Sequence, residues 1–107
     1  YKGCAIALSD ELEAGMNVVL PMAANDLLTI NGVDASFVAV AKNDGVNISA
    51  RSMGALNVQV ILEPLGGGGH LMMAGAHLQN CTLQDAEHRI HEQIDLYRAA
   101  QKENTAR

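Results

Sequence analysis

Four consecutive glycines followed by a histidine, Gly66-Gly67-Gly68-Gly69-His70, are the residues of this sequence best suited to chemistry. A glycine backbone can adopt positive φ and approach another group closely, and successive N–H groups in a curled loop can form a concave anion site. The His70 ring adds a titratable hydrogen-bonding group at the end of the loop. We therefore predict a ligand-facing loop; the alternative interpretation is a flexible surface linker.

A polar strand face upstream of the glycines is a second candidate. Residues 46–52 alternate apolar and polar side chains, which is typical of a strand with one face in the core. The polar face carries Ser49 and Arg51, and the alternative interpretation is that this face only contacts solvent. A helix is predicted directly before the glycines, and the negative end of its dipole would repel an anion at the loop. Any bound anion therefore requires the loop N–H groups, His70 and Arg51.

Hydrophobic periodicity and turn residues predict the elements that position these groups. An Asn-Asp-Gly turn at 43–45 indicates a hairpin between the second and third strands. The predicted strands cover residues 2–9, 35–41, 46–52 and 70–79. The predicted helices cover residues 17–30 and 57–65, and a third runs from a capping box at 82–85 to about 101. This order predicts a single α/β domain over residues 1–107, with a mixed β-sheet flanked by helices.

Individual residues refine these predictions. Asn57 is the expected N-cap of the middle helix, and Pro64 must end or distort its last turn. We expect Met72 and Met73 to fill the core. Residues beyond Gln101 are polar and are expected to fray.

Composition limits the function. With 107 residues, of which 49% are hydrophobic and only three aromatic, the chain predicts one domain with an aliphatic core. The net charge of −5 argues against nonspecific binding of long nucleic acid, whereas a small anionic ligand remains allowed. Cys4 and Cys81 are expected to be reduced thiols, and no apolar run is long enough to span a membrane. The start at Tyr1 suggests a piece of a larger protein.

Several kinds of catalytic site have no counterpart in the sequence. There is no P-loop, no dinucleotide-binding fingerprint and no nucleophile elbow, and we expect neither cysteine to have a nearby histidine that activates it. The aspartates are scattered, and His88 and His91, three apart on the predicted last helix, lack a convincing third metal ligand. The residues alone therefore predict a ligand-binding α/β domain without a catalytic centre.

Together, several of these segments resemble a known family. The strand 35–38, the run 48–52, Asn57-Val58, Glu63 and the Gly66–His70 element resemble the C-terminal, DHH-associated domain of DHH-family phosphoesterases. Within that family the sequence is most similar to cyclic-di-AMP phosphodiesterases of the GdpP type.

The resemblance implies a division of labour. A DHH domain of the same polypeptide would bind two manganese ions and hydrolyse cyclic di-AMP to a linear dinucleotide. The present domain would hold the nucleotide, with no catalytic residue, metal or cofactor of its own. It also implies a cytoplasmic domain whose parent is anchored in the cell membrane, and it is compatible with a homodimer. The substrate-binding residues implied are Ser49, Arg51, Asn57, Gly66, Gly67, Gly68, Gly69 and His70.

Two alternatives stay open. Other members of the same superfamily would act on short oligoribonucleotides or on 3′-phosphoadenosine 5′-phosphate. A non-enzymatic nucleic-acid-binding or nucleotide-sensing module is the third interpretation.

Overall fold

A five-stranded mixed sheet, in the order β1-β2-β3-β5-β4, organises the chain. The computed structural model describes residues 1, 3–10, 24–29, 32–42 and 44–105. β1 pairs with β2 in parallel, and the other pairs are antiparallel. The strands are β1 (Cys4–Asp10), β2 (Ala35–Lys42), β3 (Gly45–Ser52), β4 (Gly68–His70) and β5 (Met73–Gln79).

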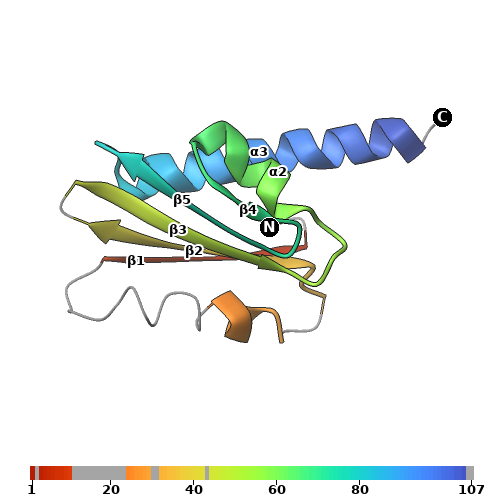
Figure 1. Cartoon of the computed structure of the whole chain (residues 1–107), viewed down its shortest axis with the longest axis horizontal. Coiled ribbons are helices and arrows are strands. Elements are labelled where there is room, and N and C mark those ends of the chain that lie inside the picture. Colours follow the sequence, from red (N-terminus) through yellow and green to blue (C-terminus); the bar gives the residue numbers. More distant parts are fainter. Residues whose placement is uncertain (2, 11–23, 30–31, 43, 106–107) are drawn as a thin grey trace.

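Helices α2 and α3 pack on one face of this sheet (Figure 1). They are α2 (Val58–Leu62), continued by the 3-10 helix η1 (Glu63–Leu65), and α3 (Leu83–Thr105). A short helical segment at 24–27 lies on the opposite face, where Ala24 packs with Val38 and Val40 of β2. The predicted α/β fold with a mixed sheet flanked by helices is therefore confirmed.

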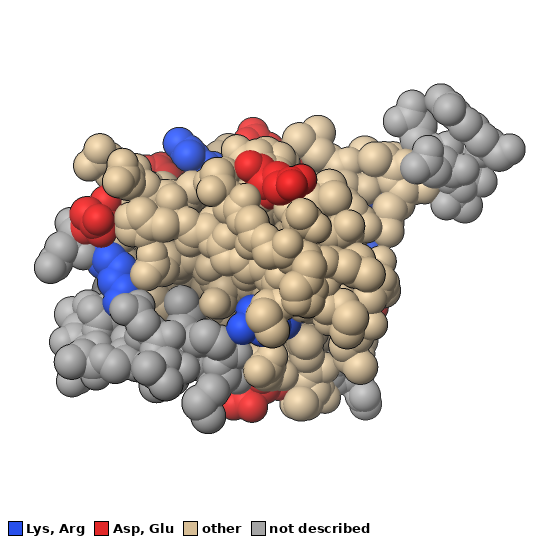
Figure 2. All heavy atoms as spheres, in the orientation of Figure 1, with Lys and Arg blue, Asp and Glu red and all other residues tan. Residues whose placement is uncertain are grey.

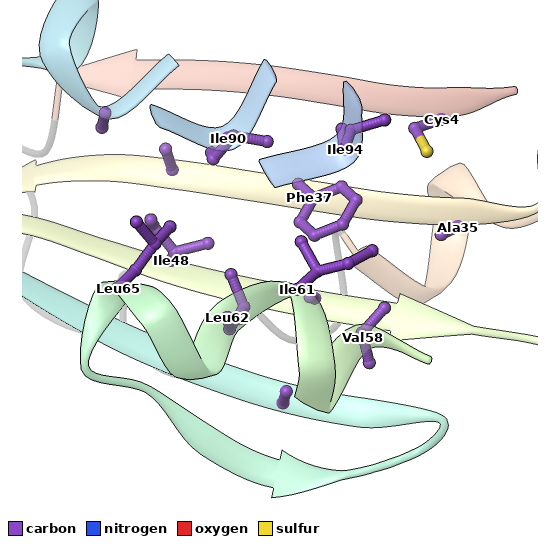
Figure 3. Close-up of a cluster of buried hydrophobic side chains, with 14 of the residues drawn as sticks. Cys4, Ala35, Phe37, Ile48, Val58, Ile61, Leu62, Leu65, Ile90 and Ile94 are labelled. Atoms are coloured by element: carbon purple, nitrogen blue, oxygen red, sulfur yellow. The ribbon is translucent and has the colours of Figure 1, made fainter. Parts of the chain in front are cut away.

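The main core lies between the sheet and the two C-terminal helices. Figure 3 shows Phe37 and Ile48 of the strands with Ile61 of α2 and with Ile90 and Ile94 of α3, and each of these side chains is at most 2% exposed. Period-2 alternation on the strands and three- to four-residue spacing on the helices bring these residues to one interface. Among the described residues, the buried core cluster is aliphatic except for Phe37 and Cys4, as the composition predicts.

Three local predictions are confirmed. The Asn57 side chain caps α2 by accepting a hydrogen bond from the Val60 N–H at 3.2 Å. Pro64 falls where α2 tightens into the 3-10 turn η1. The Thr82 hydroxyl accepts from the Asp85 N–H at 3.1 Å, which forms the expected cap of α3.

The segment 70–79 is not the single predicted strand. The chain turns at Leu71-Met72, so that β4 and β5 form a hairpin instead. Met72 and Met73 are 46% and 47% exposed, so the prediction that they fill the core is wrong. Sequence periodicity cannot reveal such a turn, because it contains neither glycine nor proline.

The helix boundaries also differ from the predictions. α3 continues to Thr105, past the fraying point expected at Gln101. Of the helix predicted over 17–30, residues 24–27 are helical and 28–29 form a turn, whereas 17–23 and 30 lie outside the described residues. No helix among the described residues is long and apolar enough to cross a membrane.

Candidate functional site

A cavity of about 320 Å³ lies where the polar face of β3 meets the β4–β5 hairpin. Strand pairing arranges its residues in two rows, and each row crosses β3, β5 and β4. The charged row holds Arg51, Met73 and His70. The second row lies two residues away along each strand and holds the small residues Ser49, Gly75 and Gly68. Alternation turns this face of β3 away from the main core. The lining residues are Ser49, Arg51, Gly68, Gly69, His70, Met73, Ala74 and Gly75.

The Arg51 guanidinium is the one group in this lining with a permanent charge. The residue is 9% exposed, and its Nη1 donates to the Ala50 carbonyl at 2.8 Å, while its buried Nε has no hydrogen-bond partner. Among the described residues, no carboxylate forms an ion pair with it. Burial lowers the pKa of Arg51, yet an arginine remains protonated in proteins. The cavity is thus lined by a largely buried cation without a carboxylate partner among the described residues, which favours an anionic ligand.

His70 stands at the exposed end of β4. The Met72 N–H donates to its Nδ1 at 3.3 Å, so a neutral ring carries its proton on Nε2. The turn that follows is held to the body of the domain, because the Met72 carbonyl accepts from the Ser52 N–H at 3.0 Å and the Leu71 carbonyl from the Val58 N–H at 3.1 Å. In that neutral form, the donor that the His70 ring offers is therefore its Nε2–H.

The first two glycines of the run end the preceding helix. The Gly66 N–H donates to the Glu63 carbonyl at 2.9 Å, and the Gly67 N–H donates to the Leu62 carbonyl at 3.0 Å. Gly66 has φ 82°, the left-handed conformation common just after a helix. A side chain at Gly67 would place its Cβ 2.5 Å from the Gly75 carbonyl oxygen. Because both N–H groups are engaged, they are not available to an anion.

The last two glycines belong to strand β4 and line the cavity. Gly69 has φ +147°, and a Cβ there would lie 2.3 Å from the Met73 carbonyl oxygen. At Gly68 a Cβ would meet no atom within 4 Å. The predicted curled loop is thus wrong in shape: the run is a helix end followed by an extended edge strand. Strand N–H groups lie in the plane of the sheet, so a concave anion site does not form over Gly68–His70.

The structure brings Ser49, Arg51, Gly68, Gly69 and His70 into one cavity. Asn57, Gly66 and Gly67 do not line it. Asn57 caps α2, and its N–H donates to the Tyr97 hydroxyl at 3.0 Å.

Three further residues line the cavity in the structure: Met73, Ala74 and Gly75. The run of small residues at 74–76 predicts, from sequence alone, that another backbone or a ligand can approach closely. The hairpin register decides which of these residues line the cavity.

Basic side chains are few on the face of the molecule drawn in Figure 2. Figure 2 shows isolated Lys and Arg side chains among uncharged and acidic ones, without a continuous basic patch among the described residues on that face. In the described part of the chain, no group of three or more His, Cys, Asp or Glu residues is placed to hold a metal ion. The charged group of the cavity is thus a single guanidinium, which can form charge-assisted hydrogen bonds with an anion.

Comparison with known proteins identifies the family. A model of the DHHA1 domain matches residues 7–102, so the chain belongs to the DHHA1 domain family. Cyclic-di-AMP phosphodiesterase GdpP of Geobacillus thermodenitrificans is 51% identical over 96 residues, which cover 89% of this chain and 15% of that protein. Cyclic-di-AMP phosphodiesterase PdeA of Listeria monocytogenes is 45% identical over 98 residues, covering 91% and 15%. The chain thus spans a small part of the length of these relatives.

A solved structure shows the same fold. An exopolyphosphatase-related protein from Bacteroides fragilis aligns with a TM-score of 0.77 and 21% identity, over 94% of this chain and 31% of that chain. At this identity the similarity establishes the architecture alone. The family assignment rests on the domain match, which covers most of the sequence.

Proposed function

We propose that this chain is the substrate-binding domain of a phosphodiesterase that hydrolyses cyclic di-AMP to a linear dinucleotide. The observation that carries the proposal is the guanidinium of Arg51, which lines an open cavity and forms no ion pair with a carboxylate among the described residues. Removing a cation from water costs free energy unless the cation is paired, and a bound phosphate would offset that cost. Relatives named cyclic-di-AMP phosphodiesterases, 45% and 51% identical, support this choice of substrate.

In this proposal the charged row contacts the phosphate. A guanidinium offers planar, paired N–H donors that match phosphate oxygens, and charge-assisted hydrogen bonds of this kind are among the strongest in proteins. His70 adds its Nε2–H from the far end of the row, and the Ser49 hydroxyl lies in the neighbouring row. These groups bind and orient the substrate. Hydrolysis is assigned to another domain of the same polypeptide.

That second domain is a DHH domain in this proposal, and two manganese ions belong to it. The donor set described here does not fit such a centre, since no three metal-ligating side chains come together among the described residues. We therefore assign no metal ligand and no catalytic residue to this chain. The proposal includes a cytoplasmic location for the domain, membrane anchoring of the whole protein, and compatibility with a homodimer.

Binding of cyclic di-AMP to the 107-residue chain, followed by NMR titration, tests the proposal. Arg51→Gln removes the cation and should weaken binding about 10- to 100-fold, because a hydrogen bond to a charged group contributes about 1.5–3 kcal/mol. Arg51→Lys keeps the charge without the planar fork and should still be impaired. Arg89→Gln, an exposed substitution on α3 with the same charge change, is the matched control.

The outcomes separate the alternatives. Unchanged affinity in both Arg51 variants, with thermal unfolding like that of the wild type, would reject phosphate recognition by this residue. Tighter binding of a short oligoribonucleotide or of 3′-phosphoadenosine 5′-phosphate than of cyclic di-AMP would transfer the proposal to that substrate class.

A further inference from the structure

Three of the five methionines in the sequence lie among the described residues, and all three are exposed. Met53, just after β3, is 69% exposed. Met72 and Met73, at the turn of the β4–β5 hairpin, are 46% and 47% exposed. Small oxidants in the solvent can therefore reach their side chains. A peroxide converts an exposed methionine thioether into a polar sulfoxide.

Met73 differs from the other two in its place on the sheet. It is the register partner of Arg51 on β3 and of His70 on β4, so it occupies the middle of the charged row. Directly opposite residues on antiparallel strands have Cβ atoms about 4.5–5.5 Å apart. Met73 lines the cavity together with both neighbours, whereas Met53 and Met72 are not among the lining residues. The Met73 side chain therefore stands between a guanidinium and an imidazole.

Both neighbours of Met73 are hydrogen-bond donors. The Arg51 guanidinium donates from Nη1 to the Ala50 carbonyl at 2.8 Å, and it forms no ion pair with a carboxylate among the described residues. The His70 ring, which accepts from the Met72 N–H through Nδ1, offers its Nε2–H in the neutral form. A thioether sulfur is only a weak acceptor for such donors. An anion in the cavity therefore meets little competition from Met73.

Oxidation reverses that relation. The thioether sulfur attacks one oxygen of hydrogen peroxide, the O–O bond breaks, an S–O bond forms, and the second oxygen leaves as water. The sulfur loses two electrons, and the peroxide gains them. The product is a polar sulfoxide on a side chain with three rotatable bonds, which can present the new oxygen to Arg51. Because a hydrogen bond from a charged donor is about twice as strong as a neutral one, this oxygen would compete with a phosphate for the guanidinium.

We propose that Met73 is a site of reversible oxidation, and that its sulfoxide occupies the Arg51 guanidinium and closes the cavity to anionic ligands. The proposal rests on the proposed function and adds regulation of the same site. The reverse reaction, catalysed by a methionine sulfoxide reductase, takes two electrons and two protons from a dithiol and releases the oxygen as water. The thioether and the open site are then restored.

Treatment of the 107-residue chain with hydrogen peroxide tests the proposal. Dithiothreitol afterwards reverses mild oxidation of the two cysteines but leaves methionine sulfoxide, and peptide mass spectrometry identifies each oxidised methionine. NMR titration should show about tenfold weaker binding of cyclic di-AMP after oxidation, and a methionine sulfoxide reductase should restore the affinity.

Two variants assign the effect to one sulfur. Met73→Leu should bind cyclic di-AMP equally well before and after peroxide treatment, because leucine is not oxidised. Met72→Leu, one residue earlier and equally exposed, is the matched control and should lose affinity on oxidation as the wild type does. Thermal unfolding should show that every oxidised protein is folded.

A second readout needs no ligand. The Nε–H resonance of Arg51 reports on its guanidinium, and burial of this atom slows proton exchange with water. Oxidation should shift the resonance in the wild type and in Met72→Leu. In Met73→Leu the resonance should stay in place.

The two readouts separate this proposal from the proposed function. An Arg51 resonance that stays in place when Met73 is oxidised, or an equal loss of affinity in Met73→Leu, would overturn the oxidation site and leave the phosphate site intact. Failure of Met73 to oxidise while Met53 and Met72 do, or unfolding of the oxidised wild type, would also overturn it. If the untreated wild type did not bind cyclic di-AMP, the proposed function would fail, and the resonance alone would decide whether the sulfoxide contacts Arg51.

Discussion

The two faces of strand β3 differ in what they contact. Val46, Ile48 and Ala50 are at most 2% exposed beneath α2 and α3, whereas Ser49 and Arg51 line the cavity on the other face. The first face is closed by helices over most of its length. The second face carries small residues and the Arg51 guanidinium instead, where β3 lies beside β5 and β4. If the proposed function is correct, stability and recognition depend on different residues of the same strand.

The largest expected effect comes from breaking the covered face. Ile61→Ala removes a side chain that is 1% exposed and packs on the sheet, so the free energy of unfolding should fall by about 2–5 kcal/mol. Val60→Ala, one residue earlier on α2 and 47% exposed, is the matched control and should stay within about 0.5 kcal/mol. Urea denaturation measures both. Equal losses in the two variants would show that α2 does not pack on the sheet as described.

Neighbouring glycines in β4 sharpen the comparison with a smaller effect. Gly69→Ala forces a side chain into positive φ and within 2.3 Å of the Met73 carbonyl oxygen, so stability should fall by about 1–3 kcal/mol. Gly68→Ala meets open space and should leave stability within about 0.5 kcal/mol. Thermal unfolding of both variants tests this. A destabilised Gly68→Ala would mean that the fold does need glycine there, contrary to the open space at this position.

Much of the fold follows from local sequence signals. The alternation of apolar and polar side chains predicted β2 and β3, and the turn residues between them predicted the hairpin that the two strands form. The caps of α2 and α3 follow from Asn57 and Thr82, whose side chains satisfy the first N–H groups of a helix. These signals suffice because each acts within a few residues of chain.

The parts that local signals missed depend on distant contacts. The turn at Leu71-Met72 contains two large apolar residues and is held by hydrogen bonds to Ser52 and Val58, which lie well upstream. Without that turn, the segment reads as one strand, and the four glycines read as a loop. From the sequence, the four glycines could therefore be given only one shared role, that of a ligand-facing loop. The structure separates two that shape the helix end from two that line the cavity.

His70 provides the smallest and most specific test of the open face. His70→Ala removes the Nε2–H donor, so affinity for cyclic di-AMP should fall about fivefold, the effect of one hydrogen bond worth about 1 kcal/mol. Because the side chain is exposed, stability should stay within about 0.5 kcal/mol. His88→Ala, at an exposed position on α3, is the matched control. An affinity equal to that of the control would remove His70 from the site. A large loss of stability would instead place His70 among the residues that hold the β4–β5 hairpin, on the structural side of the comparison.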